Sequence, residues 1–598
     1  MSTEPIHTES MRSVPRTTEH DLVIRNGTIV DGTGRARFVG DVAIDGGRLT
    51  QVGGTVRGSG VEEIDATGLI VTPGFVDIHT HMDGQITWDD VLEPSVSHGV
   101  TTIVAGNCGV GFAPVAPERR QQVIELMEGV EDIPGAALTE GMTWDWVTFP
   151  EYLDVLETRR WTIDVAQQVT HGPLRVWVMG DRAISDETPT DAEVARMAEL
   201  VGEAIGCGAL EFTTSRTHAH TARDGTLVPG THAAPDELWP IAAAVAAAGG
   251  GVFEVSPLGV VGSDPNRILD EFEWMRRLSA EFDLPVSMVL NQIPTDVGLY
   301  REVLDRALEA RAEGALVVPQ VSARSQGLLL GFTASHAFMR RPTFKAVRAD
   351  CAGDIDAMIV QLRRPEVRSA ILGEDDDAPD GTLYEGIADF ARHGAAIIFP
   401  MDDLDHEPTF ERSIAGLAAA AGVSDLEMMY DCMLEREGRA LLMAGINNYA
   451  GSGLDGVHDM LTHPASVVGL SDAGAHCNLL CDASMPTSML VHWVRDRSRG
   501  PRLSLESAVR MQTHETASLY RLGDRGTLEV GKRADVNVID FENLVLFQPE
   551  VVHDLPAGGG RLVQRASGYR ATIVAGTVIR RDDTDTGARP GRLVRGPR

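Results

Sequence analysis

Two histidines, His79 and His81, stand at the end of an apolar segment that begins at Val71. In a β-strand, residues two positions apart point to the same side, so the two imidazoles are presented together. Two converging neutral imidazoles suit Zn²⁺ or a similar ion, which takes further ligands from elsewhere in the chain. The alternative is an ordinary pair of surface histidines, but an apolar strand that ends in ligand-type side chains is typical of a barrel mouth. The segment therefore predicts half of a metal site.

Two other strand ends carry groups that could complete this site. Cys108 lies within AGNCG, where the glycines let the backbone approach a ligand closely, and a thiolate beside a metal can ligate it. Asp472 ends the segment SVVGLSD, where a carboxylate could take the proton of activated water and return it to a leaving nitrogen. The plainer alternatives are a buried cysteine that acts as a small hydrophobe and a helix N-cap at Ser471 and Asp472.

Further ligand candidates are Glu254 and His220. Glu254 ends a predicted strand and could add an oxygen ligand. His218 and His220 repeat the spacing of two, but they lie in a predicted loop, where that spacing fixes no common direction. Metal ligation is one of several common uses of histidine, so His220 stays an open candidate.

Four residues are predicted to contact a substrate. Arg216 and Arg324 each follow a predicted strand, and a guanidinium pairs bidentately with a carboxylate, although Arg324 could instead be a solvated surface arginine. Gln292 ends another strand, and its amide could orient a substrate by hydrogen bonding. His476 lies in the loop beyond Asp472. These residues favour a small anionic substrate.

The elements that must position these residues follow an alternating pattern. Apolar strands alternate with alanine-rich stretches, which predicts βα units, a parallel sheet and an α/β fold of the (β/α)8 barrel type. The predicted barrel strands are 75–79, 101–105, 162–169, 209–213, 251–255, 285–290, 315–319 and 466–472.

The gap before the last barrel strand is too long for one helix, so we expect an insertion at about 331–454. The apolar run Ala395 to Asp403 within it could instead be a core strand. The barrel with its insertion would occupy residues 73–514. Long insertions on the active face of a barrel often act as lids.

Both ends of the chain have a different sequence pattern. Short alternating segments separated by Asn-Gly, Asp-Gly and Gly-Gly predict β-hairpins in residues 21–72, and similar segments return in 515–580. A small β-sandwich domain assembled from both termini explains this. Residues 1–20 and 581–598 are polar or rich in Gly, Pro and Arg, and we expect them to be a disordered and a flexible tail.

Composition excludes several classes of protein. The 598 residues carry 52 basic and 87 acidic side chains, a net charge of −35, so binding to nucleic acid or anionic lipid is not expected. No apolar run is long enough for a membrane span, and the first twenty residues lack the apolar core of a secretory signal. Six scattered cysteines indicate a reducing, cytoplasmic setting. Only Lys345 and Lys532 are lysines, which leaves almost no candidate for a carbamylated lysine bridge.

With HTH, GNCG and SDAG in this order, the chain resembles the amidohydrolase superfamily, and most closely its N-acyl-D-amino-acid deacylase (D-aminoacylase) branch. The segments that match the family also include DLVIRNGTIVDGTG, THGPLRVWVMG and GTLEVGKRADVNVID. The resemblance implies a metal-dependent amidohydrolase that binds one or two Zn²⁺ through His79, His81 and Cys108, with Asp472 as the catalytic acid and base. Substrates would be small N-acyl amino acids, and a homo-oligomer is one possible assembly.

The chain departs from that branch at two strand ends. The family normally has metal-binding histidines after the fifth and sixth barrel strands, whereas this chain has FEVSP with Glu254 and VLNQI with Asn291. The HPR segment and the YPY-like strand that help recognise the substrate in the family are also absent. A cyclic-amide hydrolase of the hydantoinase or dihydroorotase type and a non-catalytic ligand-binding protein on the same fold therefore remain as alternatives.

Overall fold

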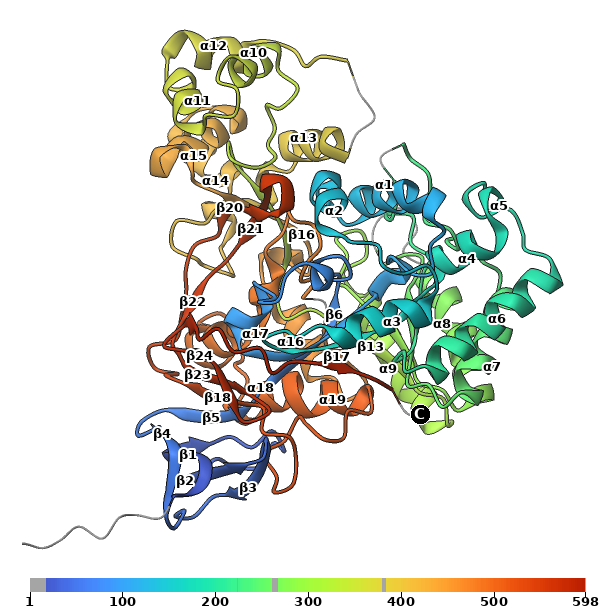
Figure 1. Ribbon diagram of the computed structural model, residues 1–598. Coiled ribbons are helices and arrows are strands. Elements are labelled where there is room, and N and C mark those ends of the chain that lie inside the picture. The colour runs from blue at the N-terminus through green and yellow to red at the C-terminus, as the bar shows by residue number, and fades with distance from the viewer. Residues whose placement is uncertain (1–17, 223, 261–266, 379–382, 470, 597–598) are drawn as a thin grey trace, which may run out of the picture.

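The computed structural model describes residues 18–222, 224–260, 267–378, 383–469 and 471–596. At its centre is a barrel of parallel strands, with β8 and β9 forming one strand interrupted at Gln168 (Figure 1). The strands are β6 (Phe75–Thr80), β7 (Val100–Ala105), β8 (Asp164–Gln167), β9 (Val169–Thr170), β10 (Phe212–Ser215), β11 (Phe253–Ser256), β12 (Val286–Val289), β13 (Val317–Val321) and β17 (Val467–Val468).

Hydrogen bonds between the first and last strands close the barrel. β13 pairs with β17 in parallel register, and beyond β17 Ala473 forms a parallel bridge with Thr80. The His81 N–H donates to the Ala473 carbonyl at 2.8 Å. The predicted (β/α)8 barrel is therefore confirmed, and the loop that carries Asp472 lies directly beside the HTH segment.

Helices cover the outside of the barrel and begin at recognisable caps. α6 begins after Thr190, whose hydroxyl accepts from the Glu193 N–H while the Glu193 carboxylate accepts from the Thr190 N–H. None of the helices in the described ranges combines the length and the apolarity that a membrane crossing requires. The helices between barrel strands include α1 (Arg120–Val130), α2 (Gly135–Gly141), α3 (Phe149–Thr158), α4 (His171–Met179), α6 (Asp191–Gly206), α7 (Pro235–Ala247), α8 (Arg267–Phe282), α9 (Leu299–Ala312) and α16 (Asp455–Thr462).

Strands from both ends of the chain form one nine-stranded sheet beside the barrel. β5 from the N-terminal part lies between β1 and β18, so the two termini are joined by a strand ladder. The sheet shares one core that includes Leu22, Val71 and Val538. Its strands are β1 (Thr18–Ile29), β2 (Phe38–Asp45), β3 (Arg48–Val52), β4 (Ser59–Asp65), β5 (Ile70–Pro73), β18 (Val536–Ile539), β23 (Tyr569–Val574), β24 (Thr577–Arg581) and β25 (Thr584–Asp585).

The two predicted tails have different outcomes. Residues 1–17 of the first lie outside the described residues, and Thr18 already begins β1. The expectation of a flexible tail over 581–598 is wrong for its described part, because β25 extends the sheet and β26 (Leu593–Val594) pairs with β8 inside the barrel. β26 occupies the space beside the first half of β8, while β9 pairs with β10. The composition of this segment, rich in Gly, Pro and Arg, does not predict β26, because this strand depends on pairing with β8, which is remote in the sequence.

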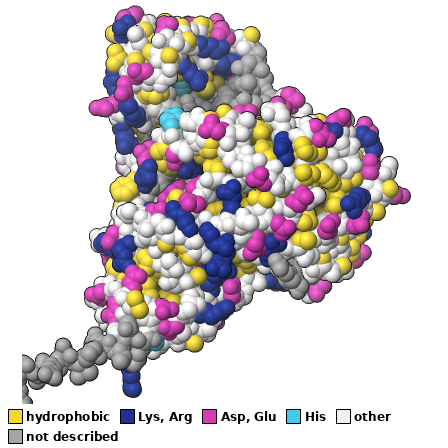
Figure 2. All heavy atoms as spheres, viewed as in Figure 1, with side chains coloured by type: hydrophobic (Ala, Val, Ile, Leu, Met, Phe, Trp, Pro, Cys, Tyr) yellow, Lys and Arg dark blue, Asp and Glu magenta, His cyan; other side chains and the backbone are white. Residues whose placement is uncertain are grey.

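Between β13 and β17 the chain forms a separate lobe, which rises above the barrel in Figures 1 and 2. The lobe contains a three-stranded sheet in the order β14, β16, β15. The apolar run that begins at Ala395 supplies β15 of this sheet, so it is not a barrel strand. The lobe comprises β14 (Gln326–Leu330), α10 (Pro342–Asp350), α11 (Ile355–Leu362), α12 (Pro365–Gly373), α13 (Leu383–His393), β15 (Ile398–Pro400), α14 (Ile414–Ala421), α15 (Asp425–Gly438) and β16 (Leu442–Asn447).

The core of the lobe also includes Leu479 and Leu480 from the loop after β17. The Leu329 N–H in β14 donates to the Leu479 carbonyl at 2.8 Å. The lobe is therefore attached to the loop that carries Asp472 and His476. On the face shown in Figure 2, acidic and basic side chains are interspersed over both the lobe and the barrel.

Candidate metal centre

The two histidines of the HTH segment converge as their spacing predicts. His79 and His81 are buried, with ring centroids 5.4 Å apart. Their Nε2 atoms both face Asp472, at 3.4 Å and 3.9 Å from its Oδ1. Asp472 adopts a left-handed conformation (φ 48°) just after the last barrel strand, which turns its carboxylate toward β6.

Cys108 reaches the same point from the end of β7. It lies in the short turn η3 (Asn107–Gly109) with φ 55°, and its Sγ is 3.4 Å from His79 Nε2. One donor atom from each of His79, His81 and Cys108 lies within 4.8 Å of the other two, and no further side chain joins this set in the described part of the chain. In tetrahedral Zn²⁺ sites, bonds of about 2.0–2.3 Å place N and S donors roughly 3.5 Å apart. The separation of His79 and Cys108 fits that value.

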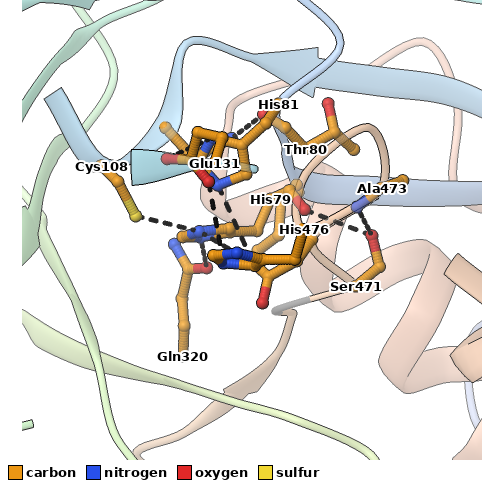
Figure 3. A network of polar contacts seen from close by, with 12 residues as sticks. His79, Thr80, His81, Cys108, Glu131, Gln320, Ser471, Ala473 and His476 are labelled. Carbon is orange, nitrogen blue, oxygen red and sulfur yellow. Dashed lines mark hydrogen bonds and ion pairs between the residues drawn. The ribbon is translucent and has the colours of Figure 1, made fainter. Parts of the chain in front are cut away.

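An acceptor atom lies behind each imidazole, hydrogen-bonded to His79 and at ion-pair distance from His81 (Figure 3). His79 Nδ1 lies 3.1 Å from Gln320 Oε1, and His81 Nδ1 lies 3.3 Å from Glu131 Oε1. An acceptor at Nδ1 favours the tautomer that leaves the Nε2 lone pair free. Burial lowers the pKa of His79 to about 4 and that of His81 well below its ordinary value. Both rings are therefore neutral at pH 7, as ligation requires.

The surroundings of the cluster contain acidic groups without a matching cation. Burial, and then the charge of Asp472, raise the pKa of Glu254 to about 8. Burial also raises the pKa of Asp472 to about 8 and moves the pKa values of Glu131 and Cys108 well above their ordinary values. Both oxygens of Glu131 and Oε1 of Glu254 are buried without a hydrogen-bond partner in the described ranges. A divalent cation would stabilise the ionised forms of all these groups, so the residues present fit a metal ion.

The weaker ligand candidates lie near the cluster but outside the set of three. Glu254 Oε2 accepts from the Cys108 N–H at 3.2 Å, so it holds the turn that presents the thiol. His220 Nδ1 is bonded to Ser215 Oγ at 2.8 Å, and the ring is close enough to His81 to affect its pKa. Ligation by Glu254 or His220 stays a prediction.

Both predicted arginine clamps are paired with carboxylates of this chain. Arg216 forms a buried bidentate pair with Glu271 of α8, at 2.6 Å and 3.2 Å, and its third nitrogen donates to the Ala233 carbonyl. Arg324 donates to Asp482 Oδ1 at 2.7 Å and also to Gln564. Each guanidinium is already paired within the protein, so these contacts do not support the prediction that Arg216 and Arg324 clamp a substrate.

Gln292 is also hydrogen-bonded within the protein. Its N–H donates to Asn448 Oδ1 at 2.7 Å, and its Oε1 accepts from the Ala450 N–H at 3.2 Å. Asn291 Oδ1 accepts from Asn448 Nδ2 at 2.9 Å. These amides connect the end of β12 to the segment after β16, and the prediction that Gln292 orients a substrate is not supported by its contacts.

His476 does lie at the site, and with it a residue that the sequence did not reveal. His476 Nε2 is 3.7 Å from Glu131 Oε2, and its side chain is 26% exposed, more than any residue of the cluster (Figure 3). Glu131 follows the C-terminus of α1, away from every strand end. Its only sequence signal is the pair Glu131-Asp132 before Ile133-Pro134, a helix end with a buried acidic residue, which is too common to single out.

Comparison with known proteins finds a family and related sequences that cover most of the chain. A sequence model described as the amidohydrolase family matches residues 62–580. D-aminoacylase of Alcaligenes xylosoxydans xylosoxydans is 26% identical over 577 residues, covering 96% of this chain and 97% of that protein. N-acyl-D-aspartate deacylase of the same organism is 27% identical over 585 residues, covering 96% and 95%.

Solved structures share the fold. A D-aminoacylase with a binuclear metal centre, described by one-metal activation and second-metal attenuation, superimposes with a TM-score of 0.64 at 23% identity, covering 96% of this chain and all of that one. N-acyl-D-glutamate deacylase from Bordetella bronchiseptica, complexed with zinc and a phosphonate mimic of the tetrahedral intermediate, gives 0.62 at 22% identity, covering 96% and 99%. These likenesses agree with the barrel fold.

Proposed function

The chain belongs to the amidohydrolase family, and we propose that it hydrolyses a linear amide C–N bond, with N-acyl-D-amino acids as the first substrate class to test. The observation that carries this proposal is the convergence of His79, His81 and Cys108 on one point beside Asp472. The relatives named D-aminoacylase and N-acyl-D-aspartate deacylase, which align over almost their whole length, support the substrate class.

His79 Nε2, His81 Nε2 and Cys108 Sγ would hold a single Zn²⁺. When bound in such a site, Zn²⁺ lowers the pKa of water to roughly 7 and polarises a carbonyl group. One ion is enough for the proposal, because one-metal activation is described for a D-aminoacylase of the same fold. The chain lacks the two histidines that the family resemblance places after β11 and β12, which also favours one ion.

Asp472 would serve as the proton carrier. Its carboxylate contacts both imidazoles but does not belong to the set of three donors, so it is free to act on a water molecule beside them. Its side chain is 13% exposed, which leaves a path for the reacting groups. The carboxylate would accept a proton from water as the carbonyl is attacked and then donate it to the leaving nitrogen.

Of the four residues predicted to bind substrate, we retain the partly exposed His476, because it lies at the candidate metal centre. It lies beside Glu131 at the edge of the cluster, on the loop that follows Asp472. His476 would contact the anionic end of the substrate, a role that Arg216 and Arg324 cannot take while they are paired with Glu271 and Asp482.

The proposal is tested by assaying the zinc-loaded protein with paired D and L enantiomers of linear N-acyl amino acids, and with cyclic imides and ureides. Turnover of the linear D substrates, lost in Asp472→Asn with zinc still bound, is the expected result. Turnover of cyclic amides alone would support the hydantoinase-type alternative. A fully zinc-loaded protein that hydrolyses no amide would support the ligand-binding alternative.

A further inference from the structure

Glu131 is a fully buried acidic residue at the candidate metal centre, and nothing in the family resemblance assigns it a role. It is 1% exposed and follows α1, so it reaches the site from a turn between two outer helices. Its carboxylate lies between two imidazoles, with Oε1 at 3.3 Å from His81 Nδ1 and Oε2 at 3.7 Å from His476 Nε2 (Figure 3).

The turn that carries Glu131 is anchored through other groups. The Glu131 carbonyl accepts from the His476 N–H, and the neighbouring Asp132 carboxylate accepts from the Asn478 N–H at 2.9 Å. These bonds fix the turn to the loop of Asp472 without using the Glu131 side chain. A structural task for the turn therefore does not explain why a carboxylate is buried there.

The Glu131 carboxyl group makes no hydrogen bond in the part of the chain that the structure describes, and its ion-pair contacts are with the two imidazoles. Both of its oxygens are buried without a hydrogen bond, and no arginine or lysine pairs with it among the described residues. A buried polar group that makes no hydrogen bond is disfavoured, so the position of this carboxyl group beside two imidazoles calls for an imidazole N–H or a cation as its partner.

We propose that Glu131 is a positioning residue that holds His81 in the tautomer with a free Nε2 and strengthens this imidazole as a metal ligand. A carboxylate behind a ligating histidine raises its basicity and fixes the orientation of its ring. The other ligand, His79, has only the neutral amide of Gln320 at the equivalent position. The two histidines are therefore supported unequally, and His81 gains the stronger donor character. This inference rests on the metal site of the proposed function.

The first test compares Glu131→Gln and Glu131→Ala with the unmodified protein by Co²⁺ titration against a competing chelator. We expect Co²⁺ affinity to fall roughly 10- to 100-fold in the alanine variant and less in the glutamine variant, with altered d–d absorption bands in both. The metal-free Glu131→Gln protein should unfold at an unchanged temperature, because the Glu131 side chain makes no hydrogen bond in the described structure that glutamine would lose. A structural role would instead lower that temperature. Glu125→Gln, on the exposed face of α1, is the matched control and should bind Co²⁺ unchanged.

A double-mutant cycle shows whether Glu131 acts through His81. In a His81→Ala background, Glu131→Ala should change Co²⁺ affinity by less than about twofold, because the ring that it positions is gone. Equal effects of Glu131→Ala with and without His81 would overturn the inference, as would unchanged affinity and spectrum in both Glu131 variants. If the unmodified protein binds neither Co²⁺ nor Zn²⁺, the metal site of the proposed function fails as well, and this outcome is distinct from the first two.

Discussion

Replacing Cys108 with alanine tests the donor set most directly. Apparent free energies of structural Zn²⁺ sites are about 10–16 kcal/mol, or roughly 2.5–4 kcal/mol for each of four ligands, which corresponds to about 60- to 700-fold in Kd. Burial raises the pKa of the Cys108 thiol, so a metal must displace its proton, and the net contribution at pH 7 belongs at the lower end of this range. We expect Cys108→Ala to weaken Zn²⁺ binding by about 100-fold.

The assay is Zn²⁺ competition with a chromophoric chelator, repeated at several pH values. Because the thiol loses a proton when it ligates, the affinity of the unmodified protein should rise more steeply with pH than that of the variant. Cys477→Ala is the control, since Cys477 is equally buried, at 6%, and lies outside the cluster. Equal Zn²⁺ affinity and equal pH slopes in Cys108→Ala and the unmodified protein would refute ligation by the thiol.

Three further predictions concern other parts of the molecule. Asp472→Asn should keep Zn²⁺ but reduce kcat by at least about 100-fold, as measured with the best linear amide; retained turnover would exclude the proton-carrier role. Burial lowers the pKa of His336 to about 3, and its Nδ1 accepts from the Phe338 N–H, so the ring stays neutral in the folded lobe. Below pH 6.5 only the unfolded chain binds this proton, and stability should fall by about 2 kcal/mol by pH 5; urea unfolding of His336→Asn at pH 7 and pH 5 should show a smaller fall. Arg216→Gln should cost about 3–5 kcal/mol in the same assay, because it leaves Glu271 buried and unpaired; a cost below about 1 kcal/mol would contradict the structural role of this pair.

Most of the site residues that the sequence revealed lie at the ends of barrel strands. His79 lies near the end of β6, Cys108 and Asp472 follow β7 and β17, and the carboxyl ends of parallel strands meet at one face of a barrel. Glu131 could not be found in this way, since its importance depends on contact with His81, which its own neighbourhood in the sequence does not encode.

The same rule failed for Arg216. Arg216 directly follows β10 and has the chemistry of a clamp, but its side chain pairs with Glu271 on α8. Position at a strand end brings a residue to the correct face of the barrel, and it does not determine which way the side chain turns. That direction depends on Glu271, which lies in a helix 55 residues further along the chain.

The strand β26 has a consequence for the order in which the protein is made. Leu593 and Val594 pair with Val165 and Ala166 of β8, and Gly591 exchanges hydrogen bonds with Trp161, so the third barrel strand lacks these partners while most of the chain is being synthesised. An unpaired strand edge is open to pairing with other chains. Until these residues have been synthesised, the barrel cannot complete its hydrogen bonding at β8.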